Sequence, residues 1–200
     1  MGTGTFDDLR VVRRLETART MIEETSHKRF IPRPGPGEYA EPFRTYVERV
    51  PEGDVLDLLA TQIDGTLRLL TGLSDEAARL RYAPGKWSVK EVVGHLSDSE
   101  RIFGYRALRF ARRDDTPLPG FDENHYVAAA EFDRVPMNDL LAEFQAVRAS
   151  TVALFSAMQA EWFERSGESN GRTISVRGIL YVTIGHELHH REILRSRYGL

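Results

Sequence analysis

The sequence contains no cysteine among its 200 residues. This absence excludes disulfide bonds, thiolate metal sites and a cysteine nucleophile. A metal ion bound by this chain must be held by nitrogen and oxygen atoms, so the six histidines and the 30 acidic residues are the available ligands.

Long apolar runs and large basic clusters are also missing. No apolar run approaches the roughly 18 residues that a membrane span needs. The opening segment MGTGTFDDLRVVRR is too acidic and polar for a signal peptide, so we expect a cytoplasmic protein. The net charge is −3, and basic residues form only short clusters such as Arg112-Arg113. We therefore expect a small-molecule substrate, and neither a nucleic acid nor a membrane, as the partner.

The chain does contain clear helical periodicity. Apolar residues recur at helical spacing in four segments, which begin near residues 54, 88, 137 and 175. Ser88 and Glu91 form a capping-box pattern at the start of the second segment. No stretch alternates with a period of two, and β-branched runs are absent. These features predict an all-α protein, an up-down four-helix bundle with a long crossover, residues 117–135, between its second and third helices.

The residues ahead of this bundle differ in character. Residues 6–26 predict a charged helix with a modest apolar stripe. Residues 31–37, IPRPGPG, predict an extended connector, because proline and glycine disrupt helices and ladder strands. We expect residues 1–37 to pack on a bundle formed by residues 38–200, so that the chain makes a single domain.

The run HELHH near the C-terminus places His186 and His190 four residues apart. Positions four apart are neighbours on one helix face, so their imidazoles can bind one metal ion. The alternative is a helix with two satisfied polar histidines, but two at ligand spacing favour a metal. His189 falls towards the edge of the apolar stripe, which predicts that it is not a ligand. The pair itself lies within that stripe, whose members include Ile179, Val182, Ile193 and Leu194.

HELHH also matches H-E-x-x-H, the helix of zinc proteases in which Glu187 would serve as general base. Such enzymes take their third ligand from well downstream, and only ten residues follow His190. They also hold peptides on an edge strand, and no sheet is predicted. A third imidazole must then come from upstream, where His27 lies beside the connector and His125 lies in an irregular loop. His95 lies on a strongly predicted helix, and bundles build ligand sites from facing helices.

Two segments carry a resemblance to a known family. GKWSVKEVVGHLSDSE at residues 85–100 and GHELHH at residues 185–190 resemble the DinB family, including its YfiT-like metal-dependent hydrolases. The resemblance extends over about residues 38–198. It implies a four-helix bundle, frequent homodimers and a zinc or nickel ion with open coordination positions. The ligands that it implies are His95, His186 and His190.

The family's chemistries include transfer of low-molecular-weight thiols such as bacillithiol, mycothiol-dependent isomerisation and hydrolysis. Our first hypothesis is therefore an enzyme whose divalent metal activates water or a low-molecular-weight thiol, for hydrolysis or for thiol transfer to a small electrophile. The alternative is a helical bundle that binds a metal or a ligand without catalysis. A second alternative is an HExxH-type zinc hydrolase.

Other polar and aromatic residues are weaker candidates. Asp98 and Glu187 are the candidate catalytic residues, and a solvated carboxylate is the alternative for each. Trp87 fits the core better than a substrate-stacking role. His125 and Tyr126 fit a plain surface loop better than a cover over the metal. A group of arginines fits a solvated helix face better than an anionic-thiol site; it comprises Arg101, Arg106, Arg109, Arg112 and Arg113.

Overall fold

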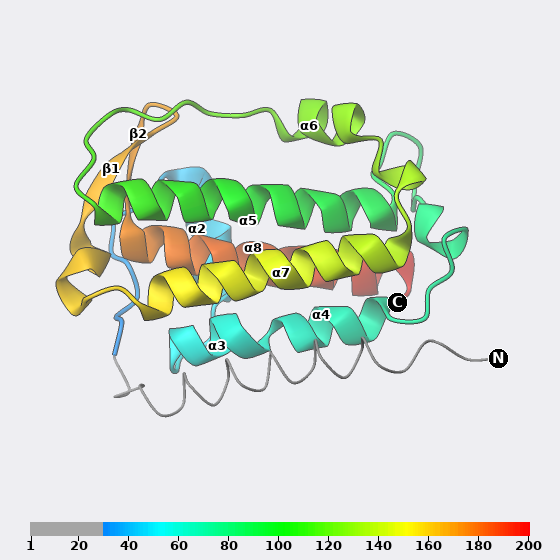
Figure 1. Cartoon of the computed structure of the whole chain (residues 1–200), viewed down its shortest axis with the longest axis horizontal. Coiled ribbons are helices and arrows are strands. Elements are labelled where there is room, and N and C mark those ends of the chain that lie inside the picture. Colours follow the sequence, from blue (N-terminus) through cyan, green and yellow to red (C-terminus); the bar gives the residue numbers. More distant parts are fainter. Residues whose placement is uncertain (1–29) are drawn as a thin grey trace. The chain divides into compact units, whose positions relative to one another are not determined.

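The computed structural model describes residues 30–200, and the helix predicted over residues 6–26 lies outside that range. The described chain is mostly helical (Figure 1). Its α-helices are α2 (Arg44–Arg49), α3 (Val55–Thr61), α4 (Ile63–Leu70), α5 (Val89–Ala111), α6 (Glu123–Ala130), α7 (Met137–Ser156) and α8 (Val176–Tyr198). Two strands, β1 (Ser166–Ser169) and β2 (Arg172–Ser175), and four 3-10 turns complete it, the turns being η1 (Glu41–Phe43), η2 (Ala77–Arg79), η3 (Phe132–Arg134) and η4 (Ala160–Glu164).

Four long helical segments form the body of this region. The pair α3 and α4 acts as one segment, and α5, α7 and α8 are the other three (Figure 1). α5 packs against both α7 and α8, and α3 also contacts these two helices. The predicted four-helix bundle is therefore confirmed. None of the helices in residues 30–200 is long and apolar enough to cross a membrane.

Local capping signals set where the bundle helices begin. The Ser88 hydroxyl accepts from the Glu91 amide, and the Glu91 carboxylate accepts from the Ser88 amide, which completes the capping box predicted for α5. The Ser175 side chain accepts from the Gly178 amide at the start of α8. The Asp54 carboxylate caps α3 in the same way. Each of these side chains satisfies backbone donors that the first helical turn leaves unpaired.

The crossover between α5 and α7 returns the chain to the end of the bundle where α5 began, so the two helices run in the same direction (Figure 1). Near their starts, the buried Lys90 ammonium donates to the Val135 carbonyl at 2.6 Å. At the end of α5, the Ala111 carbonyl accepts from the Arg165 guanidinium, which follows α7 in the chain. The crossover includes α6, so His125 and Tyr126 lie on a short helix and not in the irregular loop that we predicted.

The prediction of no sheet was wrong for one hairpin. β1 and β2 pair antiparallel, with Ser166 opposite Ser175 and Ser169 opposite Arg172. Asn170 and Gly171, both with positive φ, form the two-residue turn, which suits the twist of a hairpin. The Leu118 amide donates to the Glu168 carbonyl at 3.0 Å. This hydrogen bond holds the first part of the crossover against the hairpin at one end of the bundle.

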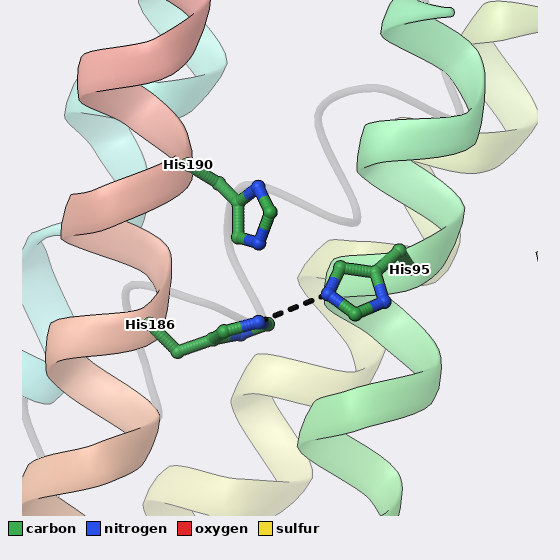
Figure 2. A group of neighbouring side chains, drawn as sticks. All are labelled: His95, His186 and His190. Atoms are coloured by element: carbon green, nitrogen blue, oxygen red, sulfur yellow. Dashed lines mark hydrogen bonds between the residues drawn. The ribbon is translucent and has the colours of Figure 1, made fainter. Parts of the chain in front are cut away.

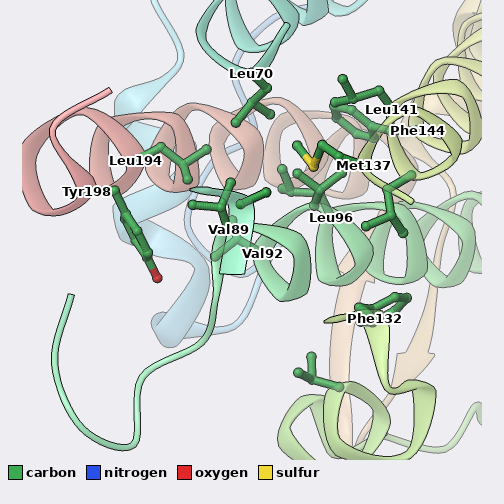
Figure 3. Packing of buried hydrophobic residues seen from close by; sticks show 14 of the residues in the cluster. Leu70, Val89, Val92, Leu96, Phe132, Met137, Leu141, Phe144, Leu194 and Tyr198 are labelled. Atoms are coloured by element: carbon green, nitrogen blue, oxygen red, sulfur yellow. The ribbon is translucent and has the colours of Figure 1, made fainter. Parts of the chain in front are cut away.

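The core beside the candidate site is built from all four long segments (Figure 3). Its apolar side chains are almost fully buried, and they hold α5 and α8 at a fixed spacing. One residue from each of α4, α5, α7 and α8 illustrates this packing, namely Leu70, Leu96, Phe144 and Leu194.

The connector ahead of α2 is extended and in contact with the bundle. The Ile31 side chain is buried, and the Tyr181 hydroxyl of α8 donates to the Ile31 carbonyl at 3.2 Å. The Arg33 guanidinium donates to the carbonyls of Val47 and Val50, which caps the end of α2. These contacts link the connector to both α2 and α8, which pack against each other. α2 forms one wall of the site described below.

Gly185 permits the close packing of α2 on α8. A Cβ atom at this position would overlap the Tyr46 backbone carbonyl. We expect Gly185→Ala to lower the free energy of unfolding by about 1–3 kcal/mol, because the two helices would have to separate. Urea denaturation is the measurement. Gly104→Ala on α5 is the control, since nothing lies within 4 Å of its Cβ position, and it should raise stability by about 0.5–1 kcal/mol. Equal behaviour of the two variants would contradict this packing.

Candidate metal centre

Three histidines meet between α5 and α8. His95 projects from α5, and His186 and His190 project towards it from successive turns of α8 (Figure 2). Each side chain is buried, with 6 to 8% of its surface exposed. The ring centroids lie 4.6 Å apart for the pair on α8, and 4.9 Å from His95 to either of them. The structure therefore brings the three predicted ligands together.

The arrangement of the ring nitrogens fits a metal ion. One ligand atom from each ring lies within 4.8 Å of the other two. Nε2 of His95 lies 3.0 Å from Nε2 of His186, and Nδ1 of His190 is buried without a hydrogen-bond partner in the described region. In Figure 2 this Nδ1 atom points away from the other two rings and Nε2 of His190 faces them, so a cation between the rings would bind the Nε2 atom of His190. This donor set of three imidazoles suits zinc, nickel and related divalent ions.

Burial keeps the three rings in the neutral form that binds metals. It lowers the pKa of His95 to about 4. It also holds the pKa values of His186 and His190 well below the usual range, with a further lowering from the neighbouring imidazoles. Nδ1 of His95 lies 3.4 Å from the Ser99 hydroxyl one turn along α5, which helps to set the ring's orientation.

Aromatic side chains enclose the histidines. Trp87 lies against His95, with ring centroids 4.6 Å apart, and its ring is nearly parallel to that of His190. Tyr46 and Phe103 meet His186 edge-on. Trp87 packs against the core, as we predicted, and it also lines the cavity beside the histidines. The walls of the centre are thus apolar on several sides.

A cavity of about 390 Å³ opens beside this cluster. His95 and His190 form part of its wall, and the rest comes from other residues of α5 and α8 and from η1, α2, the crossover and the hairpin. His189 also borders the cavity, where its ring meets Tyr46 edge-on at 5.3 Å between centroids. His189 does not belong to the group of residues whose ligand atoms converge. A small molecule in the cavity would therefore reach two of the three convergent imidazoles.

The Glu187 carboxylate is engaged inside the bundle. The side chain is buried and pairs with the Arg148 guanidinium of α7 at 2.8 Å. The Thr66 hydroxyl donates to it at 2.5 Å, and the Gln62 amide donates to it as well. The reading of Glu187 as a surface charge was therefore wrong. Its contacts turn the carboxylate towards α4 and α7, which argues against a role as an HExxH base.

Asp98, the other candidate acid–base residue, neither belongs to the convergent group nor lines the cavity. Its carboxylate is partly exposed, and its one described ion pair is with Arg101 at 3.7 Å. Burial raises the pKa of Asp98, and the positive charge of Arg101 opposes that shift. A catalytic role for Asp98 stays a prediction.

The two candidates on α6 lie at the surface. His125 is exposed, and Tyr126 contacts Phe121.

The arginine group divides between surface and interior. Arg101 pairs with Glu143, and Arg109 pairs with Asp114. Arg112 lies over the Trp162 ring. Arg106 differs, since it is buried and lines the cavity, and the reading of a solvated face was wrong for this residue.

Several residues that line the cavity could not be predicted from sequence patterns. Tyr46 lies on α2, a helix of six residues that is too short to show a periodic pattern. Phe121 lies in the crossover, and Asn170 and Thr173 lie in or beside the hairpin turn. Their placement depends on contacts between distant segments, so sequence spacing alone does not reveal them.

Comparison with known proteins finds several that are similar to this chain. A relative from Oceanobacillus iheyensis is 26% identical over 124 residues, which are 60% of this chain and 70% of the relative. A relative from Geobacillus kaustophilus is 27% identical over 135 residues, 65% and 76% of the respective chains. Both carry the name "putative metal-dependent hydrolase".

A solved structure is similar as well. YfiT from Bacillus subtilis, described as a "probable metal-dependent hydrolase with an unusual four-helix bundle topology", superposes with a TM-score of 0.65. The match has 20% identity and covers 76% of this chain and 91% of YfiT, which supports the fold. The model of the DinB superfamily matches residues 58–194, a span that includes all three convergent histidines. This chain belongs to the DinB superfamily.

Proposed function

We propose that this chain is a metal-dependent hydrolase in which His95, His186 and His190 hold one divalent cation. The observation that carries the proposal is the convergence of three buried, neutral imidazoles, two of which line a cavity. Three protein ligands leave coordination positions free, which is the pattern of catalytic metal sites and not of structural ones. The names of the relatives in Oceanobacillus and Geobacillus agree with this chemistry.

The protein residues hold and shield the reacting centre. His95 lies on one helix and the other two ligands lie on another, so the packing of α5 on α8 sets the geometry of the site. The apolar rings of Trp87 and Phe103 exclude bulk water from the ligands, which strengthens electrostatic interactions there. A divalent cation at this position supplies Lewis acidity and lowers the pKa of a nucleophile that it coordinates.

Water is the simplest nucleophile for such a site, and a low-molecular-weight thiol is the second. The chain has no cysteine, so a thiol must come from a cosubstrate. We propose zinc or nickel as the metal, since both accept imidazole ligands. The homodimer and the cytoplasmic location stay predictions.

The test is metal-dependent turnover. Protein loaded with zinc or with nickel is incubated with a panel of esters, amides, epoxides and alkyl halides, with and without added thiols. We expect at least one substrate to be converted, and chelation of the metal to reduce the rate by about a hundredfold or more, because the cation provides most of the charge stabilisation. Conversion without thiol supports hydrolysis, and conversion only with thiol supports transfer.

His186→Ala is the matched inactive variant, and Gly104→Ala, where an added Cβ has no atom within 4 Å, is the matched control. Conversion that survives both chelation and His186→Ala would contradict the proposal. Tight metal binding without any turnover across the panel would favour the non-catalytic binding bundle.

A further inference from the structure

Arg106 lies inside the cavity wall without a negative partner. It is 7% exposed, and it lines the same cavity as His95 and His190. Its Nη2 donates to the Pro119 carbonyl at 3.0 Å, and its guanidinium lies 5.8 Å from the centre of the Phe121 ring. Two residues of the crossover therefore hold the guanidinium in place.

A buried guanidinium normally has an anionic partner. The guanidinium has five N–H donors, and the Pro119 carbonyl is its one hydrogen-bond acceptor among residues 30–200. In the same region no carboxylate forms an ion pair with Arg106, although Glu123 borders the cavity. Every other arginine of the group discussed above is either exposed or paired. Burial of a charge is costly unless the charge is paired, so a ligand is the natural counter-charge here.

The position of Arg106 relative to the metal centre indicates the shape of that ligand. Residues 95 and 106 are eleven apart, which is three turns of α5, so they share one helix face. Their Cα atoms are about 16 Å apart along the helix axis. Apolar side chains line part of the cavity, namely Phe103 from α5, Ile179 and Val182 from α8, and Phe43 from η1, while polar residues of the hairpin line another part. A ligand that contacts both His95 and Arg106 can therefore place an apolar body against these side chains.

We propose that Arg106 binds the carboxylate of the substrate, and that the substrate is a small carboxylic acid with an apolar body and its reacting group at the opposite end. This inference rests on the proposed function, because it is the metal centre that defines the reacting end. A carboxylate matches the planar fork of one guanidinium and carries a single charge. A phosphate dianion would need a second buried cation, and the other arginine at the cavity, Arg172, is exposed.

The test uses three probes with one apolar body: phenylbutyrate, its uncharged amide and phenylbutyl phosphate. Binding is measured by isothermal titration calorimetry on the full chain, both zinc-loaded and chelator-treated. We expect the carboxylate to bind about 10- to 100-fold more tightly than the amide in both forms, the range for a charge-assisted hydrogen bond in a buried site. Arg106→Met should bind the two equally and should keep its metal. Arg106→Lys should keep part of the preference.

Arg101→Met is the matched control, because Arg101 lies on the same helix, pairs with Glu143 and does not line the cavity. It should behave like the wild type. A wild type that binds acid and amide equally would overturn the proposal, and this comparison needs no variant. A preference that survives in Arg106→Met but vanishes on chelation would place the carboxylate on the metal, which also overturns it. Tighter binding of the phosphate would overturn the choice of carboxylate.

Failure of the proposed function would look different. A chain that retains no metal or turns over nothing would still show the acid preference in chelator-treated protein, if Arg106 is the anion site. Conversely, metal-dependent turnover combined with no acid preference would retain the hydrolase and reject the role of Arg106.

Discussion

His186→Ala and His190→Ala should each remove the metal ion from the purified protein. We expect the wild type to contain close to one zinc or nickel ion per chain by elemental analysis. Each variant should contain at most about a tenth of that amount. The physical reason is the loss of one of three imidazoles in a site with no carboxylate ligand among the described residues. Two remaining ligands would bind a divalent cation weakly. His95→Ala should have the same effect, because its ring supplies the ligand from the opposite helix.

His189→Ala is the control for this prediction. The residue precedes His190 on the same helix, is partly buried and meets Tyr46, but lies outside the convergent group. It should retain its metal. Loss comparable to that of His186→Ala would show that the ligand set is wrong, and a wild type that cannot be loaded with zinc or nickel would reject the site.

The helices and the two histidines of α8 could be predicted because their signals are local. Ser88 and Glu91 are three residues apart, and Ser175 immediately precedes its helix, so capping can be read from neighbouring positions. The spacing of His186 and His190 places both on one face whatever the rest of the chain does. These features need no knowledge of distant segments.

The prediction of the third ligand, His95, depended on the assumption that the chain forms a helical bundle. His95 is 91 residues from His186 in the sequence, and only the packing of α5 on α8 brings the rings together. The family resemblance pointed to the same residue. Periodicity alone leaves its partner open, because a helical wheel defines a face but not the neighbour that covers it.

The hairpin and the surroundings of α8 were not predictable in the same way. The strand residues Ser166–Ser169 are small or polar and show no alternation, so they lack the pattern of a half-buried strand. Glu187 follows His186 and was read as a base or a surface charge. It is buried because α8 is covered by α2, α3 and α5 together, which leaves little of its central turns exposed. Arg106 likewise differs from its neighbouring arginines only through the crossover that covers it.

A buried ion network connects the helix that carries two of the histidines to α5 and α7. Arg148 makes two hydrogen bonds of 2.8 Å to the Glu100 carboxylate of α5 and a 2.8 Å ion pair with Glu187 of α8. It also donates to the Leu59 carbonyl at 3.1 Å. All three charged side chains are at most 4% exposed. Burial opposes the charged guanidinium, but the two carboxylates keep the pKa of Arg148 above its usual value.

Arg148→Met should destabilise the protein by about 3–5 kcal/mol, because it leaves Glu100 and Glu187 buried without a cation. The free energy of unfolding from urea denaturation at neutral pH is the measurement. Arg148→Met combined with Glu100→Gln and Glu187→Gln should recover part of the loss at neutral pH, because no buried charge is then left unpaired.

Arg101→Met is the matched control, since Arg101 forms an exposed pair with Glu143 in which 49% and 36% of the side chains are accessible. It should cost less than about 1 kcal/mol. Stability and turnover of Glu187→Gln together decide the role of Glu187. If the carboxylate serves the network, Glu187→Gln lowers the free energy of unfolding, while the protein keeps its metal and its turnover at temperatures well below unfolding. Equal effects of Arg148→Met and Arg101→Met would contradict the stabilising role of the network. Loss of turnover in fully folded Glu187→Gln would instead place Glu187 at the reacting centre.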